Sequence, residues 1–382
     1  MRIGMFCNAY RPVINGVVRS IALFRQGLQQ AGHFVSIFAP DSKGYRDEEP
    51  FVFRYPALPL PTGVEYTFPV VVAPQITWLV PKLKLDIIHT HHPFIVGSEA
   101  LNFSRTEGIP IVFTFHTIYH EYTQYFGFDV ELFKTITRRI VADYAQKVHC
   151  IIAPSLRIRD ELYHTYKVDR PVHVLRYPVD LSPFSGPRRP PLSDPERVQL
   201  LYLGRLVPEK NLHFLLRAFA LAAAEEPRLH LRIVGEGSER EALQAEIGRM
   251  DLSARVELAG PVPFCDAPGE LLRADVFLYP AQTESMSMAV LEAMAAGLPV
   301  VAVDCAALRE YLDHRVEGVL VPEEEEAFAA ALLELARMPE LARRLGEAGR
   351  TRARSYSLSS LTPRLIAIYQ ETIEQYYRTR AA

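Results

Sequence analysis

Two glutamates, Glu284 and Glu292, flank seven residues in a segment that joins an apolar run at 276–279 to a helical stretch ending near Gly297. A carboxylate accepts two hydrogen bonds at once, which suits the paired hydroxyls of a sugar. Amides at a helix N-terminus suit a phosphate. This loop and helix could therefore hold a pyrophosphate and the hydroxyls beside it, although two isolated glutamates are more often ordinary exposed residues.

A second group with possible chemistry is the pair of cations Arg205 and Lys210, in a loop that follows an apolar run at 199–203. Arginine gives forked contacts to phosphate and lysine a point charge, so the pair could converge on one anion. The alternative is two solvated surface cations. A further loop contains Gly235 and Gly237, but Arg240 stands where a third glycine would complete a dinucleotide motif, so a nicotinamide site is rejected.

The N-terminal half offers a different set of residues. Asn15 and Gly16 lie between the first apolar run and the first helical stretch, where a glycine lets the backbone approach a ligand or simply makes a turn. Histidines follow two successive apolar runs. A metal site is not expected, because no aspartate or cysteine partner has metal-site spacing and no Asp-x-Asp pair is present. The histidines are His89, His91, His92, His116 and His120.

Short apolar runs that alternate with helical stretches must position these residues. Such a pattern predicts parallel sheets covered on both faces. Residues 181–197 contain five prolines and indicate a linker, after which the pattern restarts. The predicted fold class is α/β, with two Rossmann-like domains facing each other across a cleft. The expected parts are an N-terminal Rossmann-like domain over 1–180, a C-terminal Rossmann-like domain over 198–358, and a C-terminal helix over 359–382 that packs back on the N-terminal domain.

Composition narrows the classes of function. The 382 residues carry a net charge of −3, which argues against nucleic acid as the main partner. The four cysteines form no Cys-x-x-Cys pair, which argues against a zinc ribbon. No run of about 20 apolar residues is present, so no span across a bilayer is expected. The first residues run directly into a strand pattern, so no signal peptide is expected either. A cytoplasmic location follows from these expectations.

Residues 283–301 resemble the E-x7-E donor signature of the retaining glycosyltransferases of family four, which have the GT-B fold. The helix is followed by Ala-x-Gly-x-Pro-Val-Val, as in that family. The resemblance implies that Glu284 binds hydroxyls of the transferred sugar and that Glu292 binds the ribose. The family often has Phe-Gly where this chain has Met286-Ser287. The other implied donor-site residues are Ser287 and Met288 through their amides, Arg205 and Lys210 at the diphosphate, Gly16, Gly235 and Val262.

Residues 8–17, 86–97 and 114–126 are similar to bacterial diacylglycerol glycosyltransferases. This resemblance implies a lipid acceptor with a free hydroxyl. It places His116 beside the donor sugar and assigns Asn15, His116 and Tyr119 to the acceptor. The implied catalytic set is His116, Glu284, Arg205 and Lys210, without a cofactor or a required metal.

Two apolar stretches with cations agree with contact to an anionic membrane. One spans 64–85 and includes Trp78, Lys82 and Lys84. The other spans 129–148, with apolar residues at helical spacing beside three cations. An ordinary core-facing stripe is the alternative. The stripe consists of Phe133, Ile136, Ile140 and Tyr144, and the cations are Lys134, Arg138 and Arg139.

The resemblance therefore predicts a retaining enzyme that moves a hexose from a nucleotide sugar to a lipid hydroxyl. It implies that the domain over 1–180 binds the acceptor and that the domain over 198–358 binds the nucleotide sugar. UDP-glucose or a related UDP-sugar is the expected donor. Diacylglycerol is the expected acceptor, on the inner face of the cell membrane. Three alternatives stay open: the same donor with a soluble acceptor, a nucleotide-sugar epimerase, and a catalytically silent sensor of sugar nucleotides.

Overall fold

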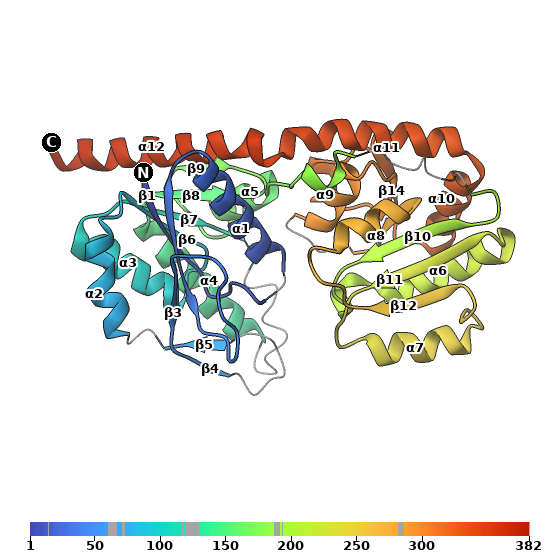
Figure 1. Cartoon of the computed structure of the whole chain (residues 1–382), viewed down its shortest axis with the longest axis horizontal. Helices are drawn as coiled ribbons and strands as arrows, with labels where there is room; N and C mark the ends of the chain where they lie inside the picture. Colours follow the sequence, from blue (N-terminus) through green and yellow to red (C-terminus); the bar gives the residue numbers. More distant parts are fainter. Residues whose placement is uncertain are drawn as a thin grey trace. The chain divides into compact units, whose positions relative to one another are not determined.

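A computed structural model describes most of the chain, and it divides into two compact units (Figure 1). Unit 1 comprises Met1–Pro178 and Leu358–Ala382, and unit 2 comprises Val179–Ser357. Of the predicted site residues, Tyr119 and Glu284 lie outside the described residues, as does His120. The described residues are 1–13, 15–59, 67–70, 73–116, 118, 130–186, 192, 194–281 and 286–381.

Unit 1 is built on a seven-stranded parallel sheet in the order β3-β2-β1-β6-β7-β8-β9. Its central strands are apolar and buried, as expected for a sheet covered on both faces. A separate antiparallel pair joins β4 (Ala57–Pro59) and β5 (Thr67–Pro69). The strands of the large sheet are β1 (Arg2–Phe6), β2 (Phe34–Pro40), β3 (Val52–Tyr55), β6 (Ile87–Thr90), β7 (Ile111–Thr114), β8 (Cys150–Ala153) and β9 (Val172–Val174).

Six helices belong to the described part of unit 1. The Asn15 side chain begins α1 by accepting a hydrogen bond from the Val18 amide. The C-terminal helix α12 packs on α1 so closely that a Cβ on Gly27 would lie 2.1 Å from Thr362 Oγ1. The helices are α1 (Gly16–Gln30), α2 (Pro74–Leu83), α3 (Ile95–Glu107), α4 (Val130–Lys147), α5 (Leu156–His164) and α12 (Leu358–Ala381).

Unit 2 is built on a six-stranded parallel sheet in the order β12-β11-β10-β13-β14-β15. On one face α6 packs on α10, while α9 contacts α8 and α11. The strands are β10 (Val198–Leu203), β11 (Leu229–Val234), β12 (Val256–Gly260), β13 (Val276–Tyr279), β14 (Val300–Val303) and β15 (Gly318–Val321). The helices are α6 (Leu212–Glu225), α7 (Arg240–Arg249), α8 (Ala267–Arg273), α9 (Met288–Ala295), α10 (Glu325–Arg337) and α11 (Pro339–Ala353).

The strand order of both units reverses beside the first strand of each sheet. In unit 1 the reversal lies between β1 and β6, and in unit 2 between β10 and β13. Parallel sheets of this kind bind ligands beyond the carboxyl ends of the strands at such a reversal. The prediction of two Rossmann-like α/β domains is confirmed.

The proline-rich stretch expected as a linker packs against unit 2 where it is described. Ser182–Phe184 forms a short 3-10 helix with Phe184 buried, and Arg350 donates to the Phe184 carbonyl at 2.9 Å. Further along, Asp275 accepts from the Leu192 amide at 2.8 Å. Proline removes backbone donors and regular structure from a segment, but it does not prevent packing.

Candidate functional site

The loop after β10 carries the two predicted phosphate-binding cations. Lys210 ends a short 3-10 helix, Pro208–Lys210, and its Nζ donates to the Tyr279 hydroxyl at 3.2 Å. Tyr279 ends β13, so Lys210 reaches across the reversal of strand order. Arg205 is half-exposed and contacts Glu209 at 3.3 Å. The structure therefore places both cations on one loop at the edge where a ligand is expected.

Three glycine-containing loops meet at this edge. Gly235 has φ +147°, and a Cβ there would lie 1.8 Å from the Gly204 carbonyl oxygen. A Cβ on Gly237 would lie 2.1 Å from the Leu206 carbonyl oxygen. The Gly235 amide donates to the Gly260 carbonyl at 2.9 Å. This hydrogen bond connects the Gly235 loop to the loop that carries the half-buried Val262. Only glycine permits this approach.

Helix α9 follows β13 and carries the described part of the E-x7-E segment. Glu292 is buried in this helix, with 3% of its surface exposed. Ser287 caps the helix, since its Oγ accepts from the Val290 amide. The Ser287 amide donates to the Tyr311 hydroxyl at 3.0 Å. Binding of a phosphate by the Ser287 amide would therefore require this amide to give up its hydrogen bond to the Tyr311 hydroxyl. The other predicted amide, that of Met288, lies at the first position of the helix.

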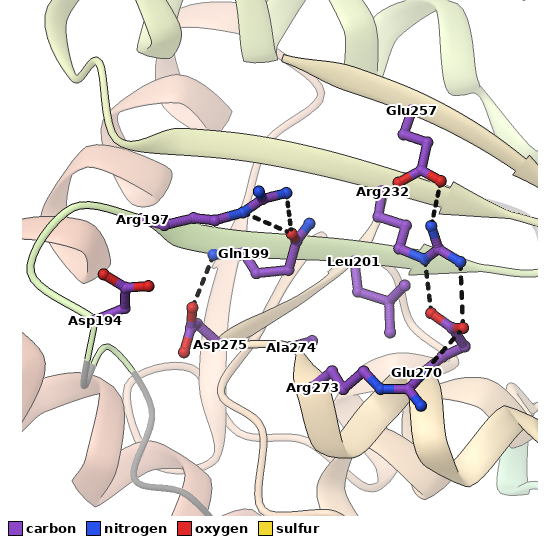
Figure 2. A pocket seen from close by; sticks show the side chains of 10 residues that line it. All are labelled: Asp194, Arg197, Gln199, Leu201, Arg232, Glu257, Glu270, Arg273, Ala274 and Asp275. Atoms are coloured by element: carbon purple, nitrogen blue, oxygen red, sulfur yellow. Dashed lines mark hydrogen bonds and ion pairs between the residues drawn. The ribbon is translucent and has the colours of Figure 1, made fainter. Parts of the chain in front are cut away.

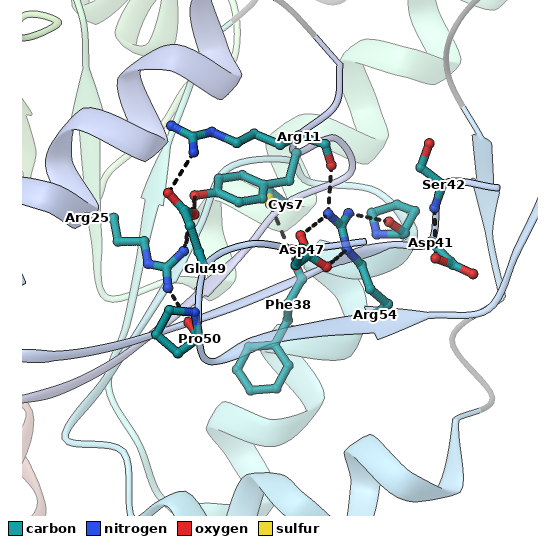
Figure 3. Close-up of polar contacts among 12 residues, drawn as sticks. Cys7, Arg11, Arg25, Phe38, Asp41, Ser42, Asp47, Glu49, Pro50 and Arg54 are labelled. Carbon is teal, nitrogen blue, oxygen red and sulfur yellow. Dashed lines mark hydrogen bonds and ion pairs between the residues drawn. The ribbon is translucent and has the colours of Figure 1, made fainter. Parts of the chain in front are cut away.

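The loop between β1 and α1 is held by an ion-pair cluster that the sequence analysis missed (Figure 3). Arg54 on β3 donates to the Arg11 carbonyl at 2.6 Å and forms an ion pair with Asp47. Glu49 pairs with Arg11 at 2.7 Å and with the buried Arg25 of α1. These contacts fix the loop that leads to Asn15 and Gly16. Arg25 and Arg11 lie 24 and 38 positions from Glu49, so these pairs gave no local signal in the sequence.

His116 follows β7 and is buried, with 3% of its surface exposed. Its Nδ1 lies 2.7 Å from the Tyr177 hydroxyl, and its Nε2 lies 2.9 Å from Nδ1 of His91. Burial, with neighbouring histidines adding to it, holds the pKa of His116 well below its usual range. Both ring nitrogens of this predicted catalytic residue are thus hydrogen-bonded within unit 1.

The histidines near His116 are also uncharged. Burial lowers the pKa of His89 to about 3 and that of His92 to about 4. His89 contacts the Tyr369 hydroxyl and Thr114 Oγ1, each at 2.6 Å. Within the described ranges, no group of three or more His, Cys, Asp or Glu side chains has an arrangement that could hold a metal ion.

Unit 2 also contains a cavity of about 400 Å³. Figure 2 shows the residues that line it. It adjoins the start of β10 and the residue before β13, which are the amino ends of these strands. Part of its charge is paired, since Arg232 contacts Glu257 and Glu270, the latter at 2.7 Å. Asp275 accepts from the Gln199 amide at 2.7 Å. The lining of this cavity contains none of the predicted site residues, and it lies at the edge of the sheet opposite to the carboxyl ends of the strands.

Comparisons with known protein families agree with the predicted family. Residues 14–183 match Glycosyltransferase Family 4, and residues 187–352 match Glycosyl transferases group 1. The alpha-monoglucosyldiacylglycerol synthase of Acholeplasma laidlawii is 26% identical over 392 residues, which covers 98% of each chain. Among the helices of the described residues, none is long and apolar enough to cross a membrane.

Solved structures share the fold. The sucrose-phosphate synthase of Thermosynechococcus elongatus matches with a TM-score of 0.80 at 17% identity, over 98% of this chain and 100% of that one. The Anabaena protein HepE in complex with UDP-glucose matches with a TM-score of 0.74 at 17% identity, over 97% and 100%. The chain belongs to the GT-B glycosyltransferases of family four, and the family predicted from residues 283–301 is confirmed.

Proposed function

We propose that this glycosyltransferase moves a hexose from a nucleotide sugar to a lipid hydroxyl with retention at the anomeric carbon. UDP-glucose or a related UDP-sugar is the donor, and diacylglycerol is the acceptor. The observation that carries the proposal is the meeting of Arg205, Lys210 and the Gly235 loop with α9 at the carboxyl edge of the unit 2 sheet. Cations, close backbone and a helix N-terminus together suit a sugar diphosphate.

The proposed chemistry breaks the bond between the anomeric carbon and the diphosphate oxygen. Negative charge grows on the departing nucleoside diphosphate, and Arg205, Lys210 and the amides at the start of α9 stabilise it. The acceptor hydroxyl attacks on the face that the diphosphate leaves. Its proton passes to the leaving phosphate. Glu292 binds the ribose, and Glu284 binds hydroxyls of the transferred sugar.

The lipid acceptor is supported by an exposed apolar face on α4. Leu132, Ile136 and Ile140 lie four residues apart and are 59%, 46% and 48% exposed. Tyr144 is buried, so it is not part of this face, and the side chain of Phe133 lies outside the described part. An apolar stripe with neighbouring cations binds an anionic membrane surface.

Helix α2 adds a second contact of the same kind. Trp78 is 66% exposed, and the ammonium of Lys82 lies over its ring. Tryptophan is favoured at the boundary between lipid and water. The name of the Acholeplasma relative points to diacylglycerol as well. We therefore place the protein peripherally on the inner face of the cell membrane.

The reaction needs no cofactor in this proposal, and we expect no requirement for a metal ion. The charge that a divalent ion would neutralise on the diphosphate falls to Arg205 and Lys210. Turnover in excess EDTA should equal turnover in Mg²⁺. A loss of more than about tenfold in EDTA, restored by Mg²⁺, would contradict this expectation.

A product assay tests the proposal directly. The protein is mixed with diacylglycerol-containing vesicles and, separately, with UDP-glucose, UDP-galactose, UDP-N-acetylglucosamine and GDP-mannose. Mass spectrometry of both phases then identifies the product, and NMR of a glycolipid gives its anomeric configuration. We expect a hexosyl diacylglycerol with the configuration of the donor.

Each other outcome favours a stated alternative. Donor consumed without glycolipid, together with transfer to a sugar, a sugar phosphate or an inositol derivative, would move the acceptor into water. An epimerised donor would indicate a nucleotide-sugar epimerase. Binding of a nucleotide sugar without turnover by any acceptor would indicate a sensor.

A further inference from the structure

Unit 1 contains a buried chain of side chains that runs through His116 and is joined by hydrogen bonds and one ring contact. Tyr177, which follows β9, contacts His116 Nδ1 at 2.7 Å, and His116 Nε2 contacts His91 Nδ1 at 2.9 Å. The rings of His91 and His89 are in contact, with centroids 4.1 Å apart. His89 in turn contacts the Tyr369 hydroxyl of α12 at 2.6 Å.

The directions of these bonds are coupled, because a neutral imidazole has one donor nitrogen and one acceptor nitrogen. If His116 donates from Nδ1 to the Tyr177 oxygen, its Nε2 must accept from His91 Nδ1. If the Tyr177 hydroxyl donates instead, His116 donates from Nε2 to His91. The Tyr177 hydroxyl therefore shares control of which nitrogen of His116 carries the proton.

The cluster is packed rather than open. Tyr177, His91, His116 and His89 are each at most 3% exposed, and the cavity among these side chains measures about 10 Å³. That volume is about the size of one water molecule and excludes a sugar. Burial also keeps the pKa of His91 well below its usual range, so the ring stays neutral. These side chains can fix one another's orientation but cannot enclose a substrate.

The two tyrosines come from the segments that connect the units along the chain. Tyr177 is the residue before Pro178, where the first segment of unit 1 ends. Tyr369 lies on α12, which begins where the chain returns to unit 1 at Leu358. Each of these segments thus contributes one buried tyrosine hydroxyl that contacts a histidine of the cluster.

We infer that Tyr177 and His91 are positioning residues that hold both nitrogens of His116, and that Tyr369 holds the adjoining His89. This inference rests on the proposed function and on the position beside the donor sugar that the family resemblance implies for His116. A ring that is held on both sides keeps one orientation and one tautomer through the reaction. The segment before Pro178 then acts on His116 through the Tyr177 hydroxyl, and α12 acts on His89 through the Tyr369 hydroxyl.

The first test removes single hydroxyls. Tyr177→Phe deletes the partner of His116, and Tyr144→Phe is the matched control, because Tyr144 is buried in unit 1 and donates to the Gly97 carbonyl at 3.0 Å. We expect Tyr177→Phe to lower kcat about tenfold, as loss of one buried hydrogen bond at the reaction centre can do. The KM for the nucleotide sugar should change less than about twofold, and the control should keep both constants.

The second test separates the two nitrogens of His91. Asparagine can place a polar atom near the position of Nδ1, and glutamine near that of Nε2. Nδ1 contacts His116, whereas Nε2 has no hydrogen-bond partner in the described structure. His91→Asn should therefore retain most of the activity, and His91→Gln should lose about as much as Tyr177→Phe. The reverse order would overturn the positioning role of His91 and favour ligand contact through Nε2.

Ring NMR distinguishes failure of this inference from failure of the proposed function. Long-range ¹H–¹⁵N spectra of histidine-labelled protein report the tautomer of each ring without any substrate. Tyr177→Phe should shift the His116 ring signals, and Tyr369→Phe those of His89, while Tyr144→Phe leaves both in place. Unchanged ring signals in the two test variants would overturn the inference. Shifted signals in a protein that transfers no sugar would overturn the proposed function alone.

Discussion

The two units share a topology but place opposite chemistry at the ligand-binding edge of their sheets. In unit 1 this edge carries buried neutral rings such as His116, held by hydroxyls. In unit 2 it carries cations, such as the half-exposed Arg205, beside glycines that bring backbone close. Strand order decides where a ligand binds, and the loop residues decide what is bound. A diphosphate suits the second edge far better than the first.

Histidines show the same contrast. Burial lowers the pKa of His89 and His92 in unit 1. In unit 2, His213 is also partly desolvated, but it lies between Glu239 and Glu246, and hydrogen bonds to these carboxylates raise its pKa. A partner of opposite charge therefore outweighs partial burial, whereas full burial without such a partner keeps the ring neutral.

The largest effect is expected from removing the charge on Lys210. Lys210→Ala should lower kcat/KM for the nucleotide sugar about 10²–10³-fold, because charge that develops on the diphosphate loses a partner. Arg217→Ala is the control, since Arg217 is a half-exposed cation of unit 2 that pairs with Glu325 on the surface. Steady-state kinetics of both variants provide the measurement. Equal activities of the two variants would remove Lys210 from the donor site.

Backbone geometry in unit 2 provides the next prediction. Gly235→Ala should lower the free energy of unfolding by more than about 2 kcal/mol, because its φ is positive and its Cβ would meet the Gly204 carbonyl. Gly248→Ala, in α7 with no atom near its Cβ, should raise it by about 0.5–1 kcal/mol. Urea unfolding measures both variants. A Gly235→Ala protein as stable as the native chain would contradict the close contact of these loops.

Acid should destabilise unit 1 before unit 2. The folded-state pKa values of its buried histidines lie below the value of about 6.5 for a free ring. Their stability contribution is therefore present above pH 6.5 and is lost as the pH falls towards about 4, by up to about 1.4 kcal/mol per pH unit for each ring. The stability contribution of His213 depends on pH in the opposite direction. Because the pKa of His213 is raised, its contribution is present below pH 6.5 and is lost as the pH rises.

Pulse proteolysis in urea at pH 7.5, 6.0 and 5.0 can follow the two units separately, with fragments identified by mass. Fragments from β6 and β7 should appear at lower urea as the pH falls. Fragments from α6 and α7 should shift less. Loss of both units at the same urea concentration at every pH would contradict this difference.

The smallest effect is expected from a substitution on the exposed face of α4, which should change membrane binding but hardly change the free energy of unfolding. Ile136→Ser should weaken binding to anionic vesicles several-fold, because it removes an exposed apolar side chain from the proposed membrane face. Leu221→Ser changes an exposed leucine of unit 2 in the same way and should leave vesicle binding unchanged. Both variants should unfold within about 0.5 kcal/mol of the native chain. Vesicle sedimentation gives the binding, and equal loss in both variants would argue against α4.

Much of the fold could be predicted because its signals are local. The apolar runs at 199–203 and 276–279 correspond to β10 and β13, each within one residue. Strands β3 and β15 give weaker signals, because Arg54 interrupts β3, and β15 lies between the charged residues Glu317 and Glu323. The loops of the candidate site were also predictable, since glycine and cations stand directly after strands at 204–210 and 235–237.

The contacts within the site could not be predicted in the same way. Tyr369 meets His89 across 280 positions of sequence, and Tyr311 meets the Ser287 amide across 24. Such pairs depend on strand register and helix packing, which no local pattern encodes. The pairing of Arg25 with Glu49 escaped prediction for the same reason.

The sequence by itself determined the parallel α/β class and the family, because hydrophobic periodicity and the motif at 283–301 are properties of neighbouring residues. Tertiary structure alone decided that both nitrogens of His116 are occupied and that Ile136 faces solvent while Tyr144 faces the core. A side chain's type fixes what it can bond. Its partners and exposure depend on which distant segments pack around it, and folding settles these through burial and satisfied hydrogen bonds.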